Sequence, residues 1–219
     1  MFRDRAEAGR LLARELHAYK GDKNVVVLGL ARGGIPVARV VADALGAPLD
    51  VLLVRKLGVP DQPELGFGAI AEGPVRVIDR LTVRGSQVTP EAVEEIVARE
   101  QLQIAMQRRI YQAFSPALGV RNRVVILVDD GLATGLTMMA AVRSIHQQGG
   151  QRIVVAVPVG SRTACKALRR EADEVVCLSS PEPFYSVGTW YEDFSQTTDR
   201  EVQEALSPSA ILNLSRREE

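Results

Sequence analysis

The chain is poor in cysteine, histidine and aromatic residues. Its 219 residues include two cysteines, two histidines, one tryptophan, four tyrosines and five phenylalanines. Cys165 and Cys177 cannot form a disulfide framework, and their spacing matches no Cys-x-x-Cys zinc or redox motif. His17 and His146 fall in predicted helices and join no cluster with metal-ligand spacing. These absences exclude a zinc module and a disulfide-rich secreted domain, and they favour a reducing, cytoplasmic setting.

Long hydrophobic runs and an excess of one charge are also absent. No segment approaches the ~20 consecutive apolar residues of a membrane helix, and the N-terminal segment lacks the apolar stretch of a signal peptide. The 27 basic and 27 acidic residues balance, so no bulk attraction to nucleic acid or to an anionic membrane is indicated. Neither a Gly-x-Gly-x-x-Gly nor a P-loop motif is present. The length and ordinary composition fit a single globular domain over residues 1–219.

Apolar runs alternate with segments of helical periodicity along most of the chain. Strands are predicted at residues 24–30, 49–57, 124–128, 152–159 and 174–178, and helices at 3–19, 33–45, 90–114, 135–148 and 163–171. Residues 67–71 and 75–79 flank a Glu-Gly-Pro turn and indicate a hairpin. The alternation predicts an α/β fold with a doubly wound, mainly parallel sheet and helices on both faces, with its core at residues 24–178.

Residues 124–137 are the most informative segment. The apolar strand ends at Asp129 and Asp130, a loop of small residues follows, and a helix begins near Gly135. Ligands of α/β sheets bind beyond the carboxyl ends of the strands, and a loop that leads into a helix offers free N–H groups to a phosphate. Paired carboxylates can accept hydrogen bonds from two sugar hydroxyls. The segment predicts a site for a phosphorylated ribose; the alternative is a buried strand whose turn tolerates Asp-Asp-Gly.

Two cationic segments follow other predicted strands. Arg32, Gly33 and Gly34 combine a guanidinium suited to phosphate with glycines that let the backbone approach a ligand closely. Arg55 and Lys56 come near the end of the second predicted strand. Because the ends of parallel strands share one edge of the sheet, we expect these groups to meet there. Taken separately, glycines at a helix start and a solvated surface charge pair are the alternatives.

Aromatic residues gather in one stretch. Five of the ten, Phe184, Tyr185, Trp190, Tyr191 and Phe194, fall within eleven residues. Nearby prolines and a glycine argue for an ordered loop rather than a long helix. Flat rings stack on flat bases, but aromatic residues also build small cores and subunit contacts. The segment is therefore a candidate for base binding, with a packing role as the alternative.

The segment at residues 124–137 resembles the signature of the type I phosphoribosyltransferases: an apolar strand, two acidic residues, three variable residues, Thr-Gly, any residue, then Thr or Ser. The resemblance implies that Asp129 and Asp130 bind the ribose hydroxyls of phosphoribosyl pyrophosphate. It implies that the following loop holds the substrate, through Gly131, Leu132, Ala133, Thr134, Gly135 and Thr137. The loop at residues 30–34 resembles the family's pyrophosphate loop. The whole chain also resembles a little-characterised bacterial group of predicted phosphoribosyltransferases, through residues 32–34, 54–58 and 182–195.

The resemblance implies a Mg²⁺-dependent transferase that moves the phosphoribosyl group to a nitrogenous base and releases pyrophosphate. Its implied catalytic residues are Asp129, Asp130, Arg32 and Lys56, and substrate binding extends to Gly33, Gly34, Arg55, Phe184, Tyr185 and Trp190. Residues 179–200, with part of 1–23, are expected to form a hood over the base. No protein cage for the metal is expected, because Mg²⁺ commonly uses substrate phosphates and water as ligands. The expected partners are phosphoribosyl pyrophosphate and a small-molecule base, and a homodimer stays open. The alternative is a non-catalytic regulatory protein that binds phosphoribosyl pyrophosphate.

Two departures from the family pattern bear on mechanism. The 6-oxopurine enzymes place an acidic residue just before the Thr-Gly of the motif, where this chain has Ala133. The pattern resembles the adenine-type branch and removes one obvious general base. In addition, the long helix predicted at 90–114 stands where other members carry a mobile catalytic loop, so the residues that close over the reaction are left open.

Overall fold

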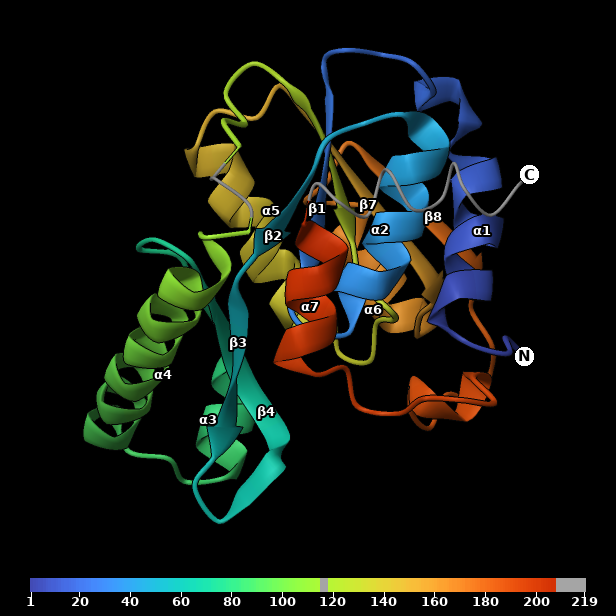
Figure 1. Cartoon of the computed structure of the whole chain (residues 1–219). Coiled ribbons are helices and arrows are strands. Elements are labelled where there is room, and N and C mark those ends of the chain that lie inside the picture. The colour runs from blue at the N-terminus through green and yellow to red at the C-terminus, as the bar shows by residue number, and fades with distance from the viewer. Residues whose placement is uncertain (115–117, 208–219) are drawn as a thin grey trace.

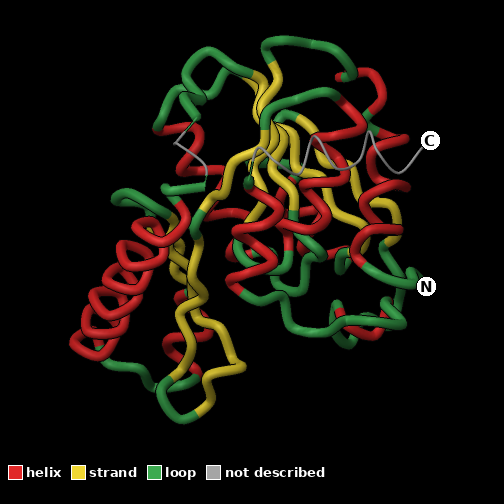
Figure 2. Tube along the Cα trace, in the orientation of Figure 1, coloured by secondary structure: helices red, strands yellow, loops and turns green. Residues whose placement is uncertain are grey.

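The computed structural model describes residues 1–114 and 118–207, in which a large parallel sheet stands beside a small antiparallel one (Figures 1 and 2). The five strands of the large sheet run in the order β2-β1-β6-β7-β8 and are all parallel. They are β1 (Val25–Leu30), β2 (Leu49–Leu52), β6 (Val124–Val128), β7 (Arg152–Val159) and β8 (Glu174–Ser179).

Helices cover both faces of the large sheet. Successive side chains of a strand point to opposite faces, so Val25 and Val27 pack with one set of helices while Val26 and Leu28 pack with the other. The first set is α1 (Arg5–Glu15), α2 (Gly34–Leu45) and α7 (Asp199–Leu206), and the second is α5 (Leu136–Gln147) and α6 (Arg162–Leu168). The doubly wound α/β fold predicted from the alternation is confirmed.

The small sheet corrects the prediction of one strand at residues 49–57. The chain leaves the large sheet after β2, passes through the fully buried Leu53, and enters the small sheet as β3 (Val54–Val59). Here β3 pairs antiparallel with β4 (Gln62–Ala71), which pairs with β5 (Arg76–Ile78) as the predicted hairpin. One continuous run of residues therefore serves two sheets, because β3 finds antiparallel partners in β4 after the chain leaves the edge strand β2.

Helix boundaries follow local capping chemistry. Asp4 caps α1 and accepts a hydrogen bond from the Glu7 N–H, so this helix starts two residues later than predicted and gives way to a 3₁₀ turn at His17–Tyr19. Thr89 caps α4 (Pro90–Tyr111) as expected, but α4 ends three residues before 114. The predicted stop at residues 115 and 116 lies outside the described residues.

Two helices were not predicted. They are α3 (Arg80–Gly85), which follows β5, and α7, which packs beside α2 and α4. The capping box of Thr198 and Glu201 at the start of α7 is a sequence signal that identifies such a helix. Within the described ranges, no helix has the length and apolar character needed to cross a bilayer.

Candidate functional site

Asp129 and Asp130 lie where β6 ends, at the carboxyl edge of the large sheet. The Asp130 N–H donates to Oδ1 of Asp129 at 2.9 Å, which holds the two carboxylates side by side. Burial, and then the negative charge of Asp130, raise the pKa of Asp129 well above its ordinary value. Burial also raises the pKa of Asp130, although Arg5 acts in the opposite direction. Two carboxylates held together at a strand end are arranged to accept hydrogen bonds from neighbouring hydroxyls.

Arg5, which the sequence analysis did not single out, binds Asp130 directly. Its Nε and Nη2 lie 2.9 and 2.8 Å from Oδ2 of Asp130, and its Nη1 donates to the Ser195 carbonyl at 2.8 Å. Its guanidinium also stacks over the Phe194 ring at 4.1 Å. The N-cap of α1 places Arg5 in the first turn of that helix. Nothing local in the sequence links positions 5 and 130, so only the fold reveals this pair.

The loop after Asp130 leads into the N-terminus of α5. Gly135, the N-cap residue, has a φ of +80° and no side chain with which to cap the helix, and a Cβ there would lie 3.1 Å from the Ala164 Cβ. The first N–H groups of α5 lack carbonyl partners within the helix. Leu132 is different, because its side chain is buried and its N–H donates to the Val159 carbonyl. Leu132 therefore has a structural role, and the free N–H donors belong to the part of the loop that follows it.

The glycines of the β1–α2 loop pack directly against the two aspartates. A Cβ at Gly33 would lie 2.1 Å from Oδ2 of Asp130, and a Cβ at Gly34 would lie 2.6 Å from the Val128 carbonyl oxygen. Gly33 and Gly34 therefore allow the two loops to touch. This contact confirms that the segments of residues 31–34 and 129–135 meet at one edge of the sheet.

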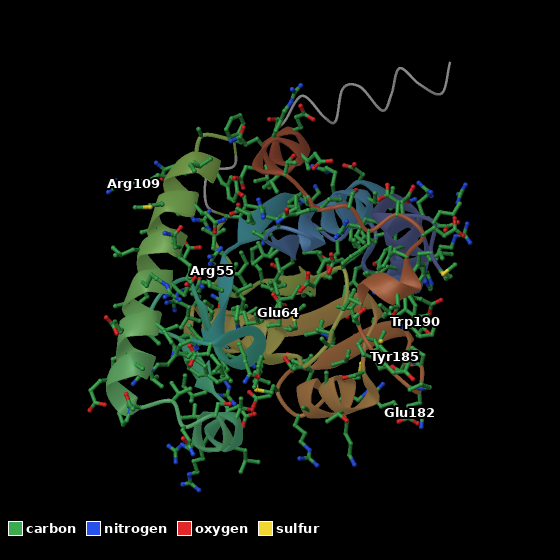
Figure 3. The ribbon with its side chains drawn as sticks, turned by 90° about the horizontal axis from the view of Figure 1, so that it is seen from below. Arg55, Glu64, Arg109, Glu182, Tyr185 and Trp190 are labelled. Atoms are coloured by element: carbon green, nitrogen blue, oxygen red, sulfur yellow. The ribbon has the colours of Figure 1, made fainter. Side chains whose placement is uncertain are left out.

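A cleft of about 790 Å³ opens between this edge and the small sheet with α4. Leu30, Ala31, Asp129 and Thr137 line one side. Side chains of β3 and α4 line the other side, and they include Arg55, Lys56, Arg99 and Glu100. Figure 3 shows Arg55 between α4 and the elements of the large sheet.

Arg55 and Lys56 reach the cleft by a route that differs from the prediction. They belong to the antiparallel strand β3, opposite Ile70 and Ala69, and do not end a parallel strand. In the structure each is paired with an acid: Arg55 Nε donates to Glu100 at 2.9 Å, and Lys56 Nζ lies 3.4 Å from Glu64 Oε2. Both side chains remain partly exposed, at 36% and 43%.

Arg32 lies in a second, smaller hollow. This hollow, of about 310 Å³, is lined by Arg32 and Gly33 together with Arg5, Asp130, Phe194, Gln196 and Thr197. Arg32 Nη1 lies 3.8 Å from Asp199 of α7. The positive charges of Arg32 and Arg55 both act on the buried Tyr111 hydroxyl, whose pKa is nevertheless raised by burial and Asp199. Arg32 in the smaller hollow, and Arg55 with Lys56 in the larger cleft, thus lie on different sides of the aspartate pair and do not share one hollow.

The aromatic segment packs against the N-terminus and the aspartate loop. Tyr191 is buried, contacts the Phe2 and Phe194 rings, and donates a hydrogen bond to the Asp130 carbonyl at 2.7 Å. For Tyr191 the packing alternative is therefore correct. Tyr185 is 82% exposed, and Trp190 is partly buried with an indole N–H that has no partner among the described residues. Figure 3 shows both on the side of the molecule away from α4. Phe184 packs at the edge of the same cluster.

Comparisons with known proteins agree with the geometry. Residues 3–195 match the model of the family described as "Phosphoribosyl transferase domain". A protein of Mycobacterium tuberculosis H37Rv, named "Putative phosphoribosyl transferase Rv0571c", is 45% identical over 202 residues, which cover 92% of this chain and 45% of that protein. The chain thus spans less than half the length of this curated relative.

Two solved structures have a fold similar to that of this chain. TT1426 from Thermus thermophilus superposes with a TM-score of 0.77 at 43% identity, and the match covers 94% of this chain and 97% of that one. AQ2163 from Aquifex aeolicus, at 11% identity and a TM-score of 0.53, covers 84% of this chain and 78% of its own and shares the fold alone. The chain belongs to the phosphoribosyltransferase family, as the sequence motif indicated.

Proposed function

We propose that the protein transfers the 5-phosphoribosyl group of phosphoribosyl pyrophosphate to a nitrogenous base. The observation that carries this proposal is the meeting of three parts at one edge of the sheet. These are the Asp129–Asp130 pair, the free N–H groups at the start of α5, and the Gly33–Gly34 loop in contact with both aspartates. A sugar, its 5′-phosphate and a pyrophosphate need one such part each.

In this proposal each segment has a distinct role. Asp129 and Asp130 accept hydrogen bonds from the ribose hydroxyls. The loop from Gly131 to Thr137 holds the 5′-phosphate, through Ala133, Thr134 and the helix N-terminus. Arg32 with the glycine loop, and Arg55 and Lys56 across the cleft, neutralise the leaving pyrophosphate. Since displacement at C1 passes through an oxocarbenium-like state, catalysis consists mainly of positioning and charge stabilisation.

Mg²⁺ fits the donor chemistry of this edge. Carboxylate oxygens are the ligands that Mg²⁺ prefers, and Asp129 faces the larger cleft. Within the described residues, however, no group of three or more acidic, His or Cys side chains could hold a metal alone. We expect substrate oxygens and water to complete the coordination, with Asp129 and Asp130 acting through the ribose hydroxyls. When bound, the ion would neutralise pyrophosphate charge.

We propose that the acceptor base lies against the aromatic segment. Phe184, Tyr185 and Trp190 offer flat surfaces, and base stacking contributes ~1–3 kcal/mol per base while tolerating different rings. Trp190→Ala should then raise the acceptor's Michaelis constant and leave phosphoribosyl pyrophosphate binding unchanged. Phe2→Leu is the control for a packing defect, because it alters the same aromatic cluster without removing a ring proposed to stack on the base. It should leave the acceptor's Michaelis constant and phosphoribosyl pyrophosphate binding unchanged. Wild-type acceptor kinetics in the Trp190 variant would place this ring in the core only.

Release of pyrophosphate with a panel of bases tests the proposal. We expect turnover with at least one base, and calorimetry should show that Asp129→Asn combined with Asp130→Asn weakens substrate binding, since a lost charged hydrogen bond costs ~1.5–3 kcal/mol. Arg32→Ala and Lys56→Ala should each lower turnover by roughly 10²–10³-fold, while ribose 5-phosphate binding changes little. Tight binding without turnover for any base would instead support the regulatory alternative. Unchanged affinity in the double variant would overturn the sugar site.

A further inference from the structure

The guanidinium of Arg5 has a partner for each of its three nitrogens. Nε and Nη2 lie 2.9 and 2.8 Å from Oδ2 of Asp130, and Nη1 donates to the Ser195 carbonyl at 2.8 Å. The guanidinium carbon lies 4.1 Å from the centroid of the Phe194 ring, and only 12% of the Arg5 side chain is exposed. A planar fork bound at every nitrogen is held in one orientation.

The backbone that carries Arg5 is also fixed, at two places. Asp4 caps α1 and sets Arg5 in its first turn. Just before it, the Phe2 N–H donates to the Trp190 carbonyl, and the Glu192 N–H donates to the Phe2 carbonyl, each at 2.8 Å. Figure 1 shows the N-terminus beside this part of the aromatic segment. A helix cap and a two-bond backbone bridge therefore support the position of Arg5.

The oxygen of Asp130 that Arg5 binds is also covered by Gly33. A Cβ at Gly33 would lie 2.1 Å from Oδ2 but 3.4 Å from Oδ1. Among the described residues, no side chain donates a hydrogen bond to Oδ1, whereas both contacts from Arg5 fall on Oδ2. Asp130 lines the smaller hollow. Oδ1 is therefore the oxygen left to accept a hydrogen bond from a ligand.

Arg5 also places a positive charge beside two carboxylates that are largely buried. Removing one partner of a buried ion pair leaves the other charge uncompensated. Arg32 lines the same hollow, but its Nη1 lies 3.8 Å from Asp199, so its charge already faces another acid. Arg5 is thus the cation that both orients Asp130 and balances its charge.

We propose that Arg5 is a positioning residue for the sugar, which holds Oδ2 of Asp130 and so presents Oδ1 to a ribose hydroxyl of the substrate. The inference rests on the proposed function, because the orientation of Asp130 matters only if a sugar binds at this edge. Arg5 itself makes no contact with the substrate. Its whole effect on binding therefore passes through Asp130.

A double-mutant cycle followed by titration calorimetry tests the proposal. Arg5→Gln should weaken the binding of phosphoribosyl pyrophosphate and of ribose 5-phosphate by at least about tenfold, because a carboxylate that can rotate makes a weaker charged hydrogen bond. In the Asp130→Ala background the same change should weaken binding by less than about twofold, since no carboxylate is left to position. A packing role alone would give the same loss in both backgrounds.

Three controls accompany the cycle. Arg5→Lys should recover part of the affinity, because an ammonium group keeps the charge but cannot bind Asp130 and the Ser195 carbonyl as a planar fork. Arg3→Gln removes the same charge two residues away, at a side chain that is 67% exposed, and should leave both affinities unchanged. Pyrophosphate, which has no sugar hydroxyl, should bind the Arg5→Gln variant nearly as it binds the wild type.

The outcomes separate this inference from the proposed function. A wild-type chain that binds neither sugar phosphate would overturn both. Sugar-phosphate binding that Arg5→Gln leaves unchanged, or weakens equally in both Asp130 backgrounds, would overturn the role of Arg5 alone. If circular dichroism shows that Arg5→Gln is unfolded, the cycle is run with Arg5→Lys, and the same two results would overturn the role.

Discussion

Gly34→Ala tests the contact on which the proposed site depends. A Cβ at Gly34 would lie 2.6 Å from the Val128 carbonyl oxygen, 2.9 Å from the Asp129 Cα and 3.0 Å from Asp129 Oδ1. Two of these three atoms are backbone at the end of β6, so a rotamer change cannot relieve the overlap. The β1–α2 loop must therefore move away from Asp129.

The loss of folding stability expected for Gly34→Ala follows from overpacking. Forcing an extra methyl group into a packed contact destabilises a protein by about 1–3 kcal/mol. For a chain of this size, each kcal/mol lowers the melting temperature by about 2–4 °C, so we expect a decrease of roughly 2–12 °C. Because the two loops bind neighbouring parts of one substrate in the proposed site, affinity for phosphoribosyl pyrophosphate should fall by at least about tenfold.

Thermal unfolding and titration calorimetry of one preparation measure both effects. Gly85→Ala is the matched control, because a Cβ there has no heavy atom within 4 Å. It should be neutral, or stabilising by up to about 1 kcal/mol, and should bind like the wild type. Equal melting temperatures for Gly34→Ala and the wild type would refute the steric argument. Lower stability with unchanged affinity would remove the β1–α2 loop from the binding site.

Three further predictions concern charge and acceptor choice. Because burial and Asp130 raise the pKa of Asp129, its proton favours the folded state; this stabilisation is complete below the unfolded pKa of about 3.9 and is lost as pH rises through the folded pKa. Asp129→Asn should therefore raise the melting temperature at pH near 7 but not near 4, which calorimetry at both values checks. Arg108, 19% exposed and bound to Glu72, should cost about 3–5 kcal/mol on change to Ala in urea unfolding, against about 0–1 kcal/mol for the more exposed Arg143. With Ala133 in place of an acid, hypoxanthine and guanine should be poor acceptors in the pyrophosphate assay, and rapid turnover of hypoxanthine would contradict this.

The long apolar strands and the nucleotide motif could be predicted from the sequence because their signals are local. A run such as residues 124–128 is apolar at every position, as a strand buried on both faces must be. The acids, the small-residue loop and the helix start then follow within a few residues. Thr89 likewise caps α4 through contacts within one turn. Such patterns depend only on neighbours in the chain, so the fold class and the position of Asp129 could be derived without coordinates.

Features that depend on long-range packing were decided by the tertiary structure. The run at 49–57 is uniform enough to read as one strand, but the partner offered by β4 divides it between two sheets. This division brings Arg55 and Lys56 to the cleft from its far wall, whereas the sequence argument placed them at a parallel strand end. Arg55 and Lys56 therefore line the larger cleft with Asp129, whereas Arg32 lines the smaller hollow with Asp130. The geometric reason given for their meeting was wrong.

The partner of Asp130 shows the same limit most clearly. Arg5 lies in an ordinary amphipathic helix, and no pattern at the N-terminus marks it as part of a site. It reaches Asp130 because α1 packs on α2 and the aromatic segment pairs with the N-terminus, through Phe2 and Tyr191. The sequence by itself determined the buried strand at residues 124–128, the start of α4 at Thr89 and the family motif that follows the strand. The tertiary structure decided which charges face the residues of that motif, because ion pairs between distant segments depend on packing that local residue patterns do not encode.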